Sequence, residues 1–247
     1  MRLVLAAELE RFGASASSLR FLSFLAATEF TSIRLCDKSG RGKLLLVSQQ
    51  NKFIGGLIAF CTILWVLAAI DPVDREAWVL ENLLVVLFAL ALWLTHRRLQ
   101  LSNASYSFIA LFLILHIIGA HYTYAKMPIG LWARNFFGSS RNHFDRVAHF
   151  GFGFFLAFPI QELLRRFSGV RRGWRFWLAP AVVLGTSGFF EILESVIAEL
   201  VAPGKGVEWL GGQGDEWDAQ NDMLSALLGS LAMMAAVTLT NWKRTAR

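Results

Sequence analysis

Long hydrophobic runs separated by short polar connections fill the sequence from residue 54 onward. A helix needs roughly 20 mostly apolar residues to cross about 30 Å of hydrocarbon, and several runs approach that length. The predicted spans are Ile54 to Ile70, Ala77 to Thr95, Tyr106 to Tyr122, Val147 to Leu164, Phe176 to Leu200 and Met223 to Asn241. This pattern predicts an all-α fold, a polytopic membrane helix bundle with six transmembrane helices.

The composition agrees with a membrane protein and excludes an ordinary soluble domain. Of 247 residues, 55% are hydrophobic and 17% are charged, whereas soluble domains carry about 25% charged residues. The net charge of +6 has a simple cause in a membrane protein, because basic residues gather in cytoplasmic loops. We therefore predict no nucleic-acid partner. Cys36 and Cys61 have neither CxxC nor metal-ligand spacing, so no disulfide framework is expected.

The basic residues of the connections are unequally divided between the two sides of the predicted bundle. Ten Lys and Arg residues lie on the side of the C-terminus, and six lie in the longer loops of the other side. Because the side richer in Lys and Arg stays in the cytoplasm, we expect both termini to be cytoplasmic. The loops after the first, third and fifth spans then face outward.

Residues 1–51 contain no complete span, since the apolar stretch from Leu19 to Ala27 is interrupted by Arg20. We predict that residues 1–51 form a cytoplasmic or interfacial segment, and that residues 52–247 form the six-helix transmembrane domain. For the first segment, an interfacial amphipathic helix, an atypical leader and translation from an upstream start all stay open.

Ionisable residues concentrate near the outer ends of the predicted spans. Such residues cost at least a few kcal/mol each inside a bilayer, so their presence asks for a functional or a pairing explanation. Several are three or four residues apart and therefore share a helix face. The set consists of His121, Asp145, His149, Glu191, Glu194, Asp218 and Asp222.

Imidazoles and carboxylates at this spacing bind divalent metals or divide general-acid and general-base roles. The spacing alone leaves a structural explanation open, in which Asp145 caps a helix and the glutamates pair with Arg141 or Arg146. At the opposite end, we interpret Glu162 as an ion-pair partner of the adjacent arginines.

Four outward-facing strings resemble a known family. They are HIIGAHYTYAKMP from His116, RNHFDRVAHFGFGF from Arg141, FFEILE from Phe189 and GGQGDEWDAQNDM from Gly211. Together they resemble the YjdF-type bacterial inner-membrane proteins, a family of unknown function, over the region from about Lys52 to the C-terminus. The resemblance implies a multi-pass protein of the bacterial inner (plasma) membrane.

The same strings are more distantly similar to the VanZ-like membrane proteins, some of which are associated with glycopeptide resistance and envelope stress. Their helix start of Asp, a basic residue and a later His corresponds here to Asp145, Arg146 and His149. Their downstream Glu corresponds to Glu191, and their Asp-rich final helix corresponds to the segment from Asp218 to Asp222. This similarity implies a role in the chemistry of the cell envelope.

Because the matched strings contain the residues that a bilayer makes costly, we favour a functional site over structural pairing. The predicted catalytic residues are His149, Asp145, Glu191 and Asp222. The predicted substrate-binding residues are Arg141, Arg146 and Tyr122. If a divalent metal is bound, its predicted ligands come from His121, His149, Glu191, Asp218 and Asp222.

Three functions fit these residues. The first is an enzyme that acts on a lipid or lipid-linked envelope substrate by metal-assisted or acid/base chemistry, although the chain has no GxSxG or HExxH motif. The second is a proton- or cation-coupled carrier, and the third is a non-catalytic structural or regulatory membrane protein. The lipid bilayer is the expected partner, and the sequence predicts no particular oligomeric state.

Overall fold

The computed structural model describes residues 41–96, 98–201 and 213–245, and every helix or strand among them is an α-helix. Residues 1–40, which make up most of the predicted N-terminal segment 1–51, lie outside the described residues. The helices are α3 (Arg41–Ala68), α4 (Arg75–Thr95), α5 (Asn103–His121), α6 (Pro128–Phe137), α7 (Phe144–Phe167), α8 (Arg172–Val201) and α10 (Asp218–Thr245).

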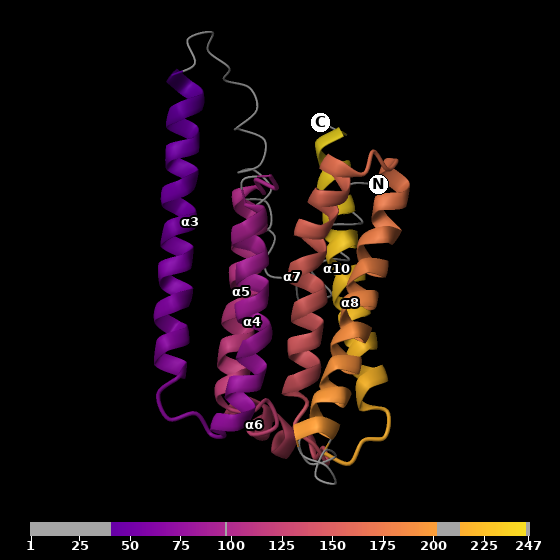
Figure 1. The fold of residues 1–247 in the computed structure, drawn as a ribbon. Helices are drawn as coiled ribbons and strands as arrows, with labels where there is room; N and C mark the ends of the chain where they lie inside the picture. The colour runs from indigo at the N-terminus through magenta and orange to yellow at the C-terminus, as the bar shows by residue number, and fades with distance from the viewer. Residues whose placement is uncertain (1–40, 97, 202–212, 246–247) are drawn as a thin grey trace.

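Six of these helices are long and apolar enough to cross a membrane, which confirms the predicted fold class. They run side by side in alternating directions, so the starts of α7 and α10 lie at the same end of the bundle as the end of α8 (Figure 1). The C-terminal end of α10 lies at the opposite end, together with the start of α3. The connections therefore alternate between the two ends as the hydrophobic pattern predicts.

One helix was not predicted. The sequence indicated a connection between the third and fourth spans, and the structure places the ten-residue helix α6 there. Pro128 suits the first turn of a helix because its missing N–H has no intrahelical acceptor there. Gly138 ends the helix with a φ of +65°, a conformation that glycine adopts without strain.

Side-chain caps fix where two of the spans begin. The Asp74 carboxylate accepts hydrogen bonds from the backbone N–H groups of Glu76 and Ala77, both at 3.0 Å, at the start of α4. At the start of α5, the Ser102 hydroxyl accepts a hydrogen bond from the N–H of Ser105 at 3.2 Å. These caps satisfy backbone donors that the first turn of a helix cannot satisfy internally.

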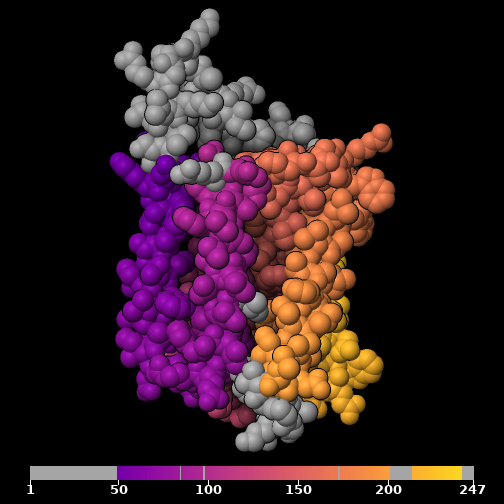
Figure 2. All heavy atoms as spheres, in the orientation of Figure 1, coloured from indigo at the N-terminus to yellow at the C-terminus, as the bar shows by residue number. Residues whose placement is uncertain are grey.

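Helix α7 is the centre of the bundle, since it packs on α5, α8 and α10. Helices α3 and α4 pack on α5 and cover one side. The core between α5, α7, α8 and α10 includes Phe108, Ala157, Val183, Ala226 and Met233. In the space-filling view, atoms of α7 are visible in a hollow between α4 and α8, so this side of the bundle is partly open (Figure 2).

Helices α7 and α10 approach so closely that glycine is required at the contact. A Cβ atom added at Gly153 would overlap the backbone carbonyl of Ala226, and one at Gly229 would overlap the carbonyl of Phe150. Because both collisions involve backbone atoms, no side-chain rotation relieves them. Small residues at such crossings let transmembrane helices pack backbone to backbone.

We expect Gly153→Ala to destabilise the bundle by about 1–3 kcal/mol or more, because the two helices must separate to admit the methyl group. Gly185→Ala is the matched control, since a Cβ there meets nothing within 4 Å. The detergent-purified variants are heated, and the folded protein that remains is measured by size-exclusion chromatography. This gives the melting temperature of each variant. Equal melting temperatures for the two variants would show that the α7–α10 contact is looser than described.

Candidate metal centre

The candidate site lies where α7 and α10 begin and where the second half of α8 passes them. Asp145 and His149 are one turn apart on α7, and Asp222 lies in the second turn of α10. One potential ligand atom from each of these three residues lies within 4.8 Å of the other two. The close α7–α10 contact described above brings them together, because it holds the first turns of both helices side by side.

The burial of the Asp222 carboxylate tests whether this group can hold a cation. Asp222 is only 2% exposed, and its Oδ1 atom has no hydrogen-bond partner. A buried carboxylate oxygen without a hydrogen bond is costly, and a cation in contact with it removes that cost. One imidazole and two carboxylates form a donor set that suits Zn²⁺, Mn²⁺ or Fe²⁺, with further coordination positions left for water or substrate. The residues therefore fit a divalent metal.

Glu191 lies next to this group from the side of α8. Its Oε1 atom is 3.6 Å from Nε2 of His149, and that same nitrogen is 3.7 Å from Oδ1 of Asp145. Glu191 is 9% exposed, and its Oε1 atom makes no hydrogen bond. The ring of Phe190 packs edge-to-face on His149 at 5.9 Å and limits how the imidazole turns. Glu191 is thus close enough to act with His149.

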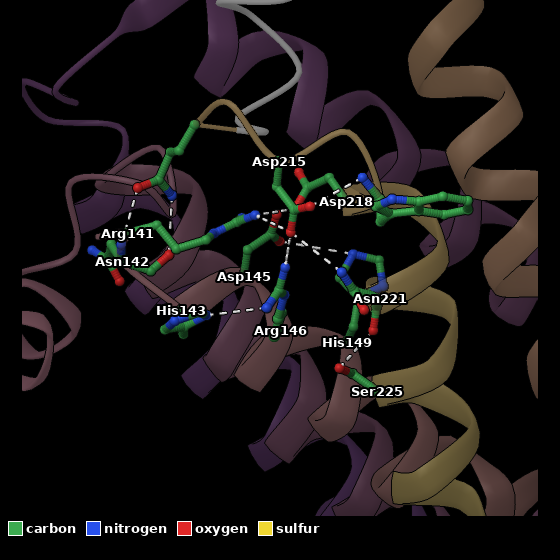
Figure 3. Close-up of polar contacts among 12 residues, drawn as sticks. Arg141, Asn142, His143, Asp145, Arg146, His149, Asp215, Asp218, Asn221 and Ser225 are labelled. Carbon is green, nitrogen blue, oxygen red and sulfur yellow. Dashed lines mark hydrogen bonds and ion pairs between the residues drawn. The ribbon is translucent and has the colours of Figure 1, made fainter. Parts of the chain in front are cut away.

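Two arginines and two aspartates cover the group (Figure 3). Nη1 of Arg141 is 3.1 Å from Asp215 and 2.5 Å from Asp218, and Arg141 is buried. Arg146 is paired with Asp215 and lies 3.9 Å from Asp218. The predicted metal ligand Asp218 therefore faces the arginines, and the structure does not bring it into the three-residue group.

The pKa values of two groups outside the spans support this ionic layer. The backbone N–H of Trp217, which donates to Asp215 at 3.0 Å, and the neighbouring Arg146 lower the pKa of Asp215. Partial burial and the guanidinium groups of Arg146 and Arg141 lower the pKa of His143. Near neutral pH, His143 is then neutral, and Asp215 is ionised and pairs with both arginines.

A reciprocal pair of hydrogen bonds joins the residue before α7 to the connection before α10. The N–H of Asn142 donates to Oε1 of Gln213 at 2.9 Å, and Nε2 of Gln213 donates to the Asn142 carbonyl at 3.0 Å. Asn142 is fully buried, and its Oδ1 accepts from the N–H of Phe144 at 3.0 Å. This pairing, which sequence reasoning missed, sets α7 and α10 in register at their first turns.

The structure does not bring His121 and Tyr122 into the group. The Nδ1–H of His121 donates to the carbonyl of Ala68 at 2.9 Å, which satisfies an acceptor at the end of α3. The ring of Tyr122 packs edge-to-face on His121 at 4.7 Å. Their position at the end of the third span suggested proximity, but that end turns toward α3.

A further carboxylate, Glu81 on α4, was overlooked because it lies inside an otherwise apolar run. Glu81 lies within electrostatic range of Asp145, Glu191 and Glu194. The rule that an ionisable residue inside a span needs an explanation applies to it as well. His116 is buried, and its Nδ1 lies 2.6 Å from the Tyr124 hydroxyl, so it is a hydrogen-bonded packing residue.

The residues of this site lie within a region of the chain that matches a known protein family. The sequence pattern of the DUF2238 family, described as predicted membrane proteins, matches residues 53–243. The chain belongs to the DUF2238 family. The match begins inside the first membrane-crossing helix of this DUF2238 protein and includes the other five and every residue of the candidate metal centre.

A curated relative extends the identification. The DUF2238 protein is 37% identical to the inner membrane protein YjdF of Escherichia coli strain K12 over 172 residues, which cover 69% of this chain and 81% of the relative. The YjdF-type resemblance is thereby confirmed, and the DUF2238 protein is a multi-pass inner-membrane protein. No solved structure matches it significantly. The more distant VanZ-like similarity stays a prediction.

Proposed function

We propose that this DUF2238 protein is a divalent-metal-dependent enzyme that acts on a lipid or lipid-linked substrate of the cell envelope. The observation that carries the proposal is the convergence of Asp145, His149 and Asp222, with ligand atoms within 4.8 Å of one another. The buried Oδ1 of Asp222, which lacks a hydrogen-bond partner, supports a cation at this position. The excess of basic residues at the opposite end favours an outward-facing site.

Each neighbouring residue has a defined role in this proposal. A divalent cation at the centre would polarise a substrate oxygen and promote ionisation of a bound water. Glu191, beside His149, would accept the proton of that water or deliver a proton to the leaving group. Arg146 would bind a substrate phosphate in place of Asp215, because guanidinium binds phosphate and carboxylate with the same geometry.

The shape of the bundle favours a lipid-derived substrate. The hollow between α4 and α8 exposes α7 along the flank of the bundle (Figure 2), and this flank would face the hydrocarbon of a bilayer. Glu81 on α4 and Glu194 on α8 are half-buried and lie within electrostatic range of each other. A lipid would enter laterally with its acyl chains in the bilayer and its headgroup at the metal centre.

A carrier function has less support. Transport through the bundle requires polar groups along the path between its two ends. Among the described residues, the buried ionisable side chains outside the centre are His116, which pairs with Tyr124, and Glu162, whose oxygens accept hydrogen bonds from Ser102 and Ser105. These hydrogen bonds give Glu162 a structural role at the start of α5.

The proposal is tested with chelator-treated protein in liposomes made from an inner-membrane lipid extract. After zinc, manganese or magnesium is added, lipid mass spectrometry should show a lipid class consumed by the wild type and by Glu216→Gln. Glu216 is exposed at the same end of the bundle and serves as the matched control. Asp222→Asn should leave that lipid class intact. Identical lipid composition in all samples, with or without metal, would refute the proposed enzymatic function.

A further inference from the structure

The short helix α6 carries an apolar stripe that no described part of the chain covers. Ile129, Trp132 and Phe136 are 60%, 63% and 69% exposed, and their spacing of three and four residues places them on one helix face. The rings of Trp132 and Phe136 are stacked with centroids 5.4 Å apart. Phe137, at the end of the helix, is 77% exposed. Such a patch is unfavourable in water.

The opposite face of α6 is fixed to the bundle. Gly130 lies at more than a quarter turn from each residue of the stripe, and it contacts the Asn142 side chain so closely that a Cβ would collide with it. Nδ2 of Asn142 donates to the carbonyls of Ala125 and Met127 at 2.9 and 3.1 Å, just before the helix. The stripe is therefore held facing away from the bundle.

The position of α6 between two membrane-crossing helices sets its depth relative to the bilayer. It lies between α5, which ends at His121, and α7, which begins at Phe144, and both neighbours are membrane-crossing helices. Thr123 and Tyr124 adopt φ values of +54° and +48° directly after α5, so the chain turns there. Figure 1 shows α6 at the end of the bundle where α7 begins. It is thus held at the level where the spans leave the hydrocarbon.

We infer that α6 is an interfacial helix that binds the bilayer surface, with its aromatic stripe at the boundary between headgroups and acyl chains. Tryptophan prefers this depth, and amphipathic helices of this kind bury their apolar face several ångströms into it. Lys126, which is exposed and lies just before the helix, matches the negative charge of lipid phosphates. The inference is independent of the proposed enzymatic function.

Site-specific fluorescence quenching tests this placement in the full chain. In a background with Cys36 and Cys61 replaced by serine, Phe136→Cys is labelled with a small fluorophore in nanodiscs of phosphatidylcholine and phosphatidylglycerol. Ser140→Cys is the matched control, because Ser140 is exposed at the same end but outside α6. Phe137→Cys serves as a second labelling position. Neither phenylalanine is buried, so the bundle should tolerate both changes.

We expect a lipid with a shallow doxyl group to quench the label at Phe136 several-fold more than the label at Ser140. Aqueous iodide should show the opposite preference. Iodide quenching at Phe136 and Phe137 equal to that at Ser140 would place α6 in water and overturn the inference. Protection from both quenchers, with cross-linking between copies through Phe136→Cys, would assign the stripe to a protein interface and overturn it as well.

Discussion

Asp222→Asn is expected to weaken divalent-metal binding by at least about 100-fold, since changes outside the direct ligands already cost roughly 10- to 100-fold. The substitution keeps the size of the side chain and removes the charge that faces Asp145 and His149. Competition with a metal-binding dye measures the affinity of the purified protein. Glu216→Gln, an exposed carboxylate at the same end, should bind as the wild type does.

The stability of the metal-free proteins separates a binding role from a structural one. Without a cation, the buried Oδ1 of Asp222 lacks a hydrogen-bond partner and lies near other carboxylates, so its neutralisation should leave stability unchanged or raise it. Added metal should raise the melting temperature of the wild type and not that of Asp222→Asn. A metal-free variant that is strongly destabilised would indicate that Asp222 locks the helices instead.

Glu162→Ala is expected to destabilise the protein by about 3–5 kcal/mol, because hydrogen bonds to a charged group contribute about 1.5–3 kcal/mol each and several donors lose their acceptor. Glu162 is 1% exposed and accepts hydrogen bonds from Ser102 N–H at 3.0 Å and from the Ser102 hydroxyl at 2.8 Å. It also accepts one from the buried Ser105 hydroxyl. The ion pair with Arg166 contributes less, because the Arg166 side chain is 37% exposed.

The corresponding decrease in melting temperature is about 6–20 °C for a domain of this size. Glu162→Gln should lie between the alanine variant and the wild type, because its amide oxygen still accepts from the start of α5. Glu216→Ala, which removes an exposed carboxylate, is the control and should melt with the wild type. If Glu162→Ala and Glu216→Ala melted at the same temperature, the hydrogen bonds of Glu162 would not stabilise the start of α5.

The fold was largely predictable because each span is a long apolar run, and such runs are visible without any knowledge of packing. Helix α6 was not, since its ten residues, Pro128–Phe137, are too few to stand out as a hydrophobic run. The N-terminal extension of α3 to Arg41 was also missed, because the helix continues through polar residues beyond the apolar run.

The sequence predicts those site residues whose proximity depends on their spacing within one helix. Asp145 and His149 share a face of α7 by their separation, and Asp222 follows from the start of the last helix. His121 depends instead on which neighbour its helix end meets, and the structure joins it to the carbonyl of Ala68, 53 residues earlier. The pairing of Asn142 with Gln213 spans 71 residues, and no local pattern indicates such a contact. Glu81 carried a usable signal, an acid within an apolar run, that went unused.

The most direct measurement is the metal content of wild-type protein after chelator treatment and reloading with zinc or manganese, determined by mass spectrometry. The account predicts one divalent ion per chain at saturation, lost in parallel from Asp222→Asn and His149→Ala at equal folded yield. A well-folded wild type that binds no divalent ion, or one whose bound metal is unaffected by both substitutions, would contradict a metal centre at Asp145, His149 and Asp222.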